Sequence, residues 1–80
     1  GRATQLAARF ASKEATMKAL GTGNRGVAWK EIEVQRLPSG KPFIKLHGRA
    51  KERAKFIGIK KIELSISHSK ELATAMVIMH

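Results

Sequence analysis

The feature that most limits how this chain can fold is a change of hydrophobic period along it. Residues 4–20 are rich in strong helix formers, and the glycine-rich segment 21–26, with Gly21, Gly23 and Asn24, can end a helix in the left-handed conformation. Residues 29–37 instead alternate apolar and polar side chains, which predicts a half-buried strand. The turn "PSGK" and a second strand at 43–46 follow, so we expect an antiparallel hairpin after the first helix.

The second half of the chain repeats this order. Residues 48–57 place Ala50, Ala54 and Ile57 at i, i+4 and i+7, which predicts a short amphipathic helix ended by Gly58. Residues 62–67 alternate apolar and polar side chains. Residues 73–79 are instead almost continuously apolar, as is typical of a central strand or of one covered on both faces. We therefore predict one α+β domain over residues 1–80, with a mainly antiparallel sheet on which one long and one short helix pack.

Composition limits the partners and the compartment. Sixteen Lys and Arg against six Asp and Glu give a formal charge of +10, which favours a polyanionic partner. The chain has no cysteine, and no apolar run approaches the roughly 20 residues of a membrane span. We expect a cytoplasmic protein without a membrane partner. A chain of 80 residues buries only about 60 to 65% of its unfolded surface, so oligomerisation is also expected.

The first helix carries two charges in an unexpected position. A helical wheel places Glu14 and Lys18 on the side that we predict to pack, together with Ala3, Leu6, Ala7, Phe10, Ala11 and Met17. The predicted solvent side holds Gln5, Arg9, Ser12 and Thr16, with Arg2 and Lys13 near its edge. Exposed Glu and Lys at i, i+4 commonly form only a weak surface pair, but on a packed side they indicate a cleft, a subunit interface or a ligand. Such a pair could hold a magnesium ion and the phosphate it binds.

Several segments resemble one known family. The segment "RFASKEATMKALGTG", a strand with Trp29, then "SGKP" and "SISH" occur in the order found in holo-acyl-carrier-protein synthase, the short trimeric type of 4′-phosphopantetheinyl transferase. The resemblance covers essentially all 80 residues. It implies transfer of phosphopantetheine from coenzyme A to a serine of an acidic acyl carrier protein, with Mg²⁺ as cofactor and adenosine bisphosphate as the second product. It also implies a homotrimer with its sites at subunit interfaces.

The resemblance assigns roles to particular residues. In the family motif F-x-x-K-E-x-x-x-K, matched from Phe10 to Lys18, Glu14 would hold the magnesium and Lys18 would contact the coenzyme phosphates. These two residues would carry the catalysis. Lys13 belongs to the same motif, and its position at the edge of the helix permits either a ligand contact or a structural one.

Four further residues are implied to bind coenzyme A. Arg9 would lie near the phosphates, although an ordinary surface arginine is the alternative. Gly40 and Pro42 would line the adenine, and a plain hairpin turn is their other interpretation. His68 continues the alternation of Ile62, Leu64 and Ile66 towards the buried side of its strand. There it would serve the phosphates, the alternative being a histidine buried for structural reasons.

The implied reaction is a phosphoryl-type transfer in which positioning and charge neutralisation do most of the work. The carrier serine attacks the β-phosphorus in line. Its proton goes to a base, for which a metal-associated water and Glu14 are both candidates.

One departure from the family is that members begin with a strand I-G-x-D, whose aspartate also holds magnesium. No such motif occurs here, so the chain corresponds to the C-terminal two-thirds of a member, and Gly1 favours a processed or truncated chain. We expect weak binding of magnesium and coenzyme and poor turnover by these residues alone.

Two other classes of function compete with the transferase. A basic nucleic-acid-binding module would explain the charge, but Trp29 and three phenylalanines are too few for a base-stacking platform, so we expect no nucleic-acid partner. An inactive homologue with only an assembly role is the third possibility.

Overall fold

The computed structural model describes residues 2–21, 26–70 and 72–80. In chain order the elements are α1 (Arg2–Leu20), the 3-10 turn η1 (Trp29–Glu31), β1 (Ile32–Arg36), β2 (Pro42–Leu46), α2 (Gly48–Phe56), β3 (Ile62–His68) and β4 (Ala73–Met79). This order confirms the predicted α+β class. Gly21 follows α1 with φ +69°, while the other predicted helix-ending residues, Gly23 and Asn24, lie outside the described residues.

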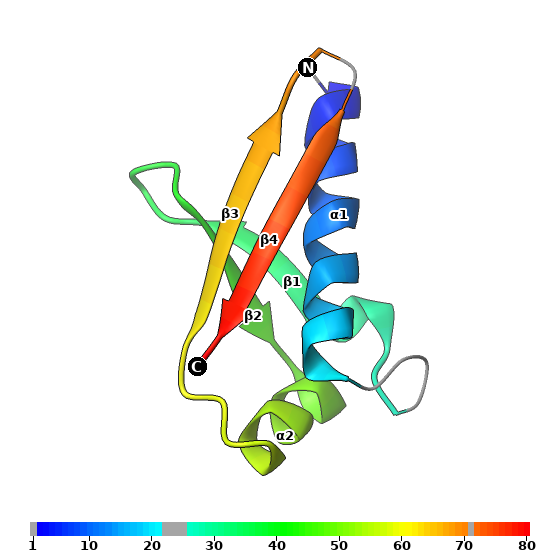
Figure 1. Ribbon diagram of the computed structural model, residues 1–80, viewed down its shortest axis with the longest axis vertical. Coiled ribbons are helices and arrows are strands. Elements are labelled where there is room, and N and C mark those ends of the chain that lie inside the picture. Colours follow the sequence, from blue (N-terminus) through cyan, green and yellow to red (C-terminus); the bar gives the residue numbers. More distant parts are fainter. Residues whose placement is uncertain (1, 22–25, 71) are drawn as a thin grey trace.

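The strands form two antiparallel hairpins. In the first, Ile32 of β1 lies opposite Leu46 of β2; in the second, Ile62 of β3 lies opposite Met79 of β4. The hairpins are separate two-stranded sheets, and β2 contacts β3 where they cross. Figure 1 shows α1 running alongside β4, with α2 at the end of the molecule where the chain terminates.

The first hairpin starts later than predicted. Residues 29–31 form η1, and the strand begins only at Ile32. The reason is the Glu31 carboxylate, whose oxygens accept the backbone N–H groups of Ala28 at 2.7 Å and of Arg49, near the start of α2, at 2.6 Å. A carboxylate at a helix N-terminus is favourable because it meets unpaired N–H groups and the positive end of the helix dipole. Gly48 permits this approach, since a Cβ there would collide with Glu31 Oε2.

The core lies where the end of α1, both hairpins and α2 meet. It consists of Leu20, Val27, Ile32, Ile44, Ala50, Ala54 and Leu64. The burial of Ala50 and Ala54 confirms the predicted inner side of the short helix. Ile57, predicted to continue that side, is instead 37% exposed because α2 ends at Phe56.

The predicted orientation of α1 is wrong. The helix buries Ala8, Ser12, Thr16 and Leu20, whereas Leu6 and Phe10 are 60% and 58% exposed. Ala7, Glu14 and Lys18 are also exposed, while Ala11 and Met17 are half-buried. Ala3, also placed on the packed side, lies outside the residues whose burial is described.

Small side chains and local hydrogen bonds explain this orientation. Ser12 Oγ donates to the carbonyl oxygen of Ala8, and Thr16 Oγ1 donates to that of Ser12, each at 2.7 Å. Both buried hydroxyls are thus satisfied within the helix, so burying them carries no unpaired donor. A side of small residues also lets β4 approach α1 closely, which a side with Phe10 would prevent.

The last strand is not covered on both faces by the described residues. Along β4 the burial alternates, with Ala73, Ala75, Val77 and Met79 half-buried. On the other face Met76 is 61% and Ile78 is 50% exposed. The apolar run therefore contributes to two faces, and the part of the chain that the structure describes covers one of them. None of the helices in the described part of the chain is long and apolar enough to cross a membrane.

Candidate functional site

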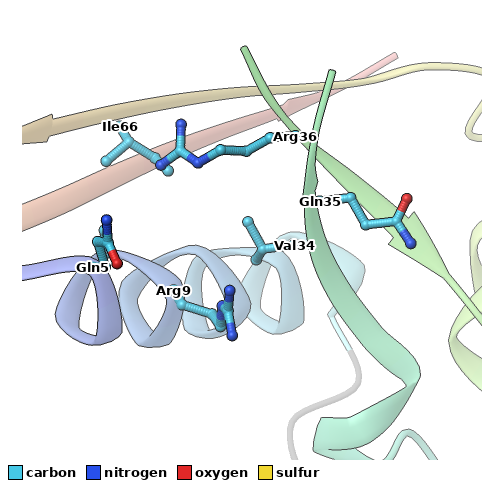
Figure 2. Close-up of a pocket in the computed structure, with 7 residues that line it drawn as sticks. Gln5, Arg9, Val34, Gln35, Arg36 and Ile66 are labelled. Carbon is cyan, nitrogen blue, oxygen red and sulfur yellow. The ribbon is translucent and has the colours of Figure 1, made fainter. Parts of the chain in front are cut away.

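A cavity of about 530 Å³ opens between α1, β1 and β3. Its lining combines Arg9 and Gln5 from α1, Arg36 from β1 and Ile66 from β3. Figure 2 shows the Arg36 side chain extending from β1 towards Ile66, with Arg9 on the helix below. The described lining residues include two guanidinium groups and no carboxylate, so the cavity suits an anion.

Arg36 connects this cavity to the first hairpin turn. Its Nη1 donates to the carbonyl oxygen of Gly40 at 2.8 Å. The turn itself is closed by the N–H of Gly40 donating to the Leu37 carbonyl oxygen at 2.8 Å, and Gly40 has φ +92°, a conformation that other residues rarely adopt. The predicted turn is therefore confirmed. Arg36 links the predicted adenine-lining turn to the cavity that contains Arg9.

Glu14 and Lys18 lie on another side of α1. Neither lines the cavity, and both are exposed. On an ideal helix Glu14 is rotated from Arg9 by about 140° and Lys18 by about 180°. Among the described residues, no group of three or more His, Cys, Asp or Glu side chains could hold a metal. The expectation that Glu14 is directed into the packed side of this chain is wrong, so its proposed metal role rests on the family motif.

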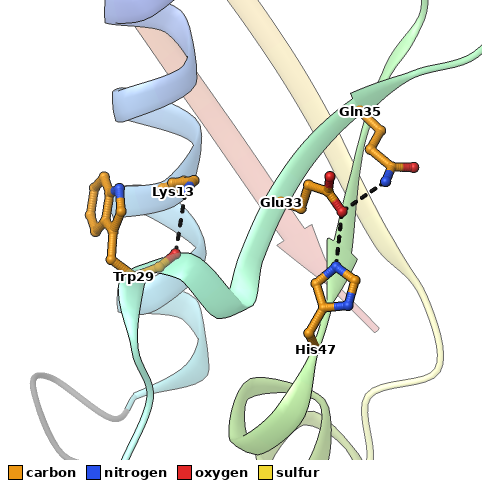
Figure 3. A network of polar contacts seen from close by, with 5 residues as sticks. All are labelled: Lys13, Trp29, Glu33, Gln35 and His47. Carbon is orange, nitrogen blue, oxygen red and sulfur yellow. Dashed lines mark hydrogen bonds and ion pairs between the residues drawn. The ribbon is translucent and has the colours of Figure 1, made fainter.

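Lys13 makes a structural contact. Its Nζ donates to the carbonyl oxygen of Trp29 at 3.3 Å and lies 5.5 Å from the centre of the indole ring (Figure 3). The Phe10 ring is 5.0 Å from the same indole, centre to centre. The contact of Lys13 with Trp29 is the structural one of the two interpretations of Lys13, and its contact with a ligand stays a prediction. The contact with Trp29 fastens η1 to α1.

The remaining predicted residues are spread over the surface. Pro42 is the half-buried first residue of β2 and lies beyond the turn that contains Gly40. His68 ends β3 opposite Ala73 and is exposed, so the prediction that it is buried is wrong. The reason is its place at the last position of the strand, two residues beyond Ile66, which is half-buried.

A polar network occupies the outer side of the first hairpin. The Oε1 atom of Glu33 accepts a hydrogen bond from Gln35 Nε2 at 2.8 Å and lies 2.9 Å from His47 Nε2 (Figure 3). The bonds from His47 and then Gln35 lower the pKa of Glu33 below its ordinary value of 4.5. Gln35 lines the cavity of Arg9, whereas Glu33 and His47 do not.

Arg36 and the contact of Trp29 with Lys13 are not among the residues predicted from the sequence. The signal for Arg36 was present in the alternation of β1, because Arg36 shares the parity of the inward-facing Ile32 and Val34. No comparable signal existed for Trp29. Its contact with Lys13 depends on η1, which the alternating pattern did not predict.

Comparison with known proteins gives one consistent family. The model of the 4′-phosphopantetheinyl transferase superfamily matches residues 1–77. A holo-[acyl-carrier-protein] synthase of Solibacter usitatus is 54% identical over 76 residues, which are 94% of this chain and 61% of that protein. The Koribacter versatilis protein of the same name is 49% identical over 76 residues, which are again 94% of this chain and 61% of that protein. The chain thus spans about three fifths of the length of these curated relatives.

The fold agrees with this match. The crystal structure of Helicobacter pylori holo-[acyl-carrier-protein] synthase in complex with coenzyme A superposes with a TM-score of 0.82 at 32% identity. The superposition covers 96% of this chain and 65% of the Helicobacter pylori chain.

Proposed function

We propose, because the chain belongs to the 4′-phosphopantetheinyl transferase superfamily, that it transfers 4′-phosphopantetheine from coenzyme A to a serine of an acyl carrier protein. The observation that carries this proposal is the family match over residues 1–77, which includes Glu14 and Lys18 in the family motif. The coenzyme A bound to the Helicobacter pylori relative supports the donor. We also propose the cytoplasm as the compartment, which a chain without cysteine fits.

The division of the site between two sides of α1 supports sites at subunit interfaces, and the homotrimer that we propose is the assembly that the family resemblance implies. Arg9 and Arg36 share one cavity, while Glu14 and Lys18 lie on the exposed side that carries Leu6 and Phe10. Large exposed apolar side chains next to a charged pair are typical of a surface that another protein covers. We infer that the cavity of one copy meets the Glu14 side of another.

Magnesium fits this arrangement as a partly hydrated ion. Glu14 is an exposed carboxylate one helical turn from the Lys18 ammonium, and magnesium commonly takes one or two carboxylates with phosphate oxygens and waters. When bound, the ion would neutralise the diphosphate and polarise its phosphorus. Glu14 is the residue of this chain that would hold it.

The other residues would position and neutralise the coenzyme. Lys18 would offset the negative charge that develops on the leaving bisphosphate, while Arg9 and His68 would hold phosphate oxygens. Gly40 and Pro42 would line the adenine. The carrier serine oxygen forms the new bond to the β-phosphorus as the bond to the bisphosphate oxygen breaks, and the serine proton leaves to a base. The net charge of +10 would attract an acidic carrier.

Transfer of labelled phosphopantetheine tests this proposal. We would assay the chain alone and a chimera in which it replaces the matching 76 residues of the Solibacter usitatus relative. With magnesium, coenzyme A and an apo carrier protein, we expect efficient transfer by the chimera. The Glu14→Ala variant should lower its rate by at least about a hundredfold, as removal of an electrostatic catalytic group commonly does.

Glu52→Ala is the matched control, because Glu52 is an exposed carboxylate on α2 outside the proposed site. It should leave the rate unchanged. Undiminished transfer by Glu14→Ala would remove Glu14 from the mechanism. A folded chimera without transfer would contradict the proposed activity itself.

A further inference from the structure

A second concave surface shares no lining residue with the cavity of Arg9. It is a groove of about 480 Å³ between β2, α2 and the segment that leads into β3, at the end where Figure 1 places α2. Phe43, Leu46, Ile59 and Ile62, all half-buried, form its apolar floor. None of the residues assigned to phosphopantetheine transfer lines it.

The walls of this groove carry a concentrated positive charge. Five lysines line it, all exposed: Lys45, Lys51, Lys55, Lys60 and Lys61. The described lining contains no acidic residue, and the ion pair between Lys61 and Glu63, at 3.7 Å, is a loose contact at its margin. Like charges around one groove repel one another, so an anionic partner would relieve that repulsion.

The fold holds these lysines in place. Lys51 and Lys55 lie one turn apart on α2. Lys60 and Lys61 are fixed through their backbones, because both N–H groups donate to the carbonyl oxygen of His80, at 2.9 Å and 2.7 Å. The N–H of Ile59 donates to the Ala54 carbonyl oxygen at 2.8 Å, which ties the groove floor to α2.

The geometry points to an acidic amphipathic segment of a partner protein as the occupant of this groove. The lysines come from three different segments, so a compact anion such as phosphate would meet only some of them. A longer segment with several carboxylates, such as an amphipathic helix, would meet most of the lysines. Its apolar side chains would cover the floor of the groove. Electrostatic complementarity around an apolar centre is the usual arrangement of specific interfaces.

This inference does not depend on the proposed transferase activity. The groove and the Glu14 side of α1 share no residue, so binding here and phosphopantetheine transfer are separately measurable. A loss of one without the other would tell the two apart.

Fluorescence anisotropy with designed peptides tests the groove. The probe is a labelled helical peptide with glutamates on one side and leucines on the other, and its companion replaces the leucines with serines at equal charge. We expect the Lys51→Glu/Lys55→Glu chain to bind the leucine peptide at least about tenfold more weakly than the unaltered chain in 150 mM salt. We expect the serine peptide to bind the unaltered chain at least about fivefold more weakly than the leucine peptide.

The matched control is Lys30→Glu/Lys70→Glu, which changes the net charge equally at exposed positions outside the groove. It should weaken binding by less than about twofold. If Lys51→Glu/Lys55→Glu fails to fold by circular dichroism, Lys45→Glu/Lys60→Glu, which changes the net charge by the same amount, replaces it with the same expectation.

Four results would overturn the inference. If both pairs of substitutions weaken binding equally, binding depends on the net charge of the chain and not on the groove. If both peptides bind equally, the apolar floor contributes nothing to binding. Displacement of the peptide by millimolar inorganic phosphate would indicate a compact-anion site. A change in the sedimenting mass of the Lys51→Glu/Lys55→Glu chain would mean that a second copy covers the groove.

Discussion

At the scale of single residues, Glu31 joins two distant parts of the chain. Its carboxylate accepts the N–H groups of Ala28 and Arg49, which fixes η1 against the start of α2. These bonds, Ala28 first and Arg49 second, lower the pKa of Glu31 below its ordinary value of 4.5. Because the folded pKa is depressed, the stabilisation exists above pH 4.5 and is lost as the pH falls through the folded value.

We therefore predict that Glu31→Gln lowers the melting temperature at pH 7, since an amide offers one acceptor oxygen where the carboxylate uses two. The difference from the unaltered chain should shrink when the measurement is repeated at successively lower pH below 4.5, as the carboxylate becomes protonated. Thermal unfolding followed by circular dichroism measures both. Glu52→Gln, at an exposed position of α2, should not change the melting temperature at pH 7. A difference for Glu31→Gln that grows as the pH falls would contradict the assigned contacts.

At the scale of elements, α1 is oriented by its small residues. Ser12, 0% exposed, lies on the packed side, and Ala7 is exposed. We predict that Ser12→Leu lowers the free energy of unfolding by about 1–3 kcal/mol, because the larger side chain has no space between α1 and its neighbours. Ala7→Leu should change it by less than about 0.5 kcal/mol. Urea unfolding measures the free energy of unfolding of both variants. A larger loss for Ala7→Leu than for the variant on the packed side would favour the helix orientation expected from hydrophobicity.

At the scale of the whole molecule, this chain leaves much apolar surface uncovered. Phe10 on α1 is 58% exposed and Phe56 at the end of α2 is 83% exposed, in a chain of only 80 residues. If the Glu14 side of α1 is the subunit interface, Phe10→Asp should weaken self-association at least about tenfold in sedimentation equilibrium, because it buries an unpaired charge there. Phe56→Asp introduces the same charge outside that side and should leave association unchanged. Equal effects of both substitutions would place the interface elsewhere.

The sequence by itself determined the order of elements and the family of this protein. Period, turn residues and the motif from Phe10 to Lys18 are local properties, so they can be recognised without knowing what packs against what. Both helices, the four strands, the first hairpin and the turn at Gly40 followed from them, whereas the pairing of β3 with β4 in a separate sheet did not.

The tertiary structure alone decided which side of α1 is buried, where β1 begins and how the site residues are divided. Hydrophobicity favoured the side with Phe10, but the packing partner required small residues, and Ser12 and Thr16 satisfied their hydroxyls inside the helix. Strand β1 starts at Ile32 because the backbone N–H of Arg49, 18 residues away, donates to the Glu31 carboxylate. The angle between Arg9 and Glu14 follows from the helical repeat. That Arg9 lines the cavity and Glu14 does not was decided by contacts between segments distant in sequence, which no local pattern records.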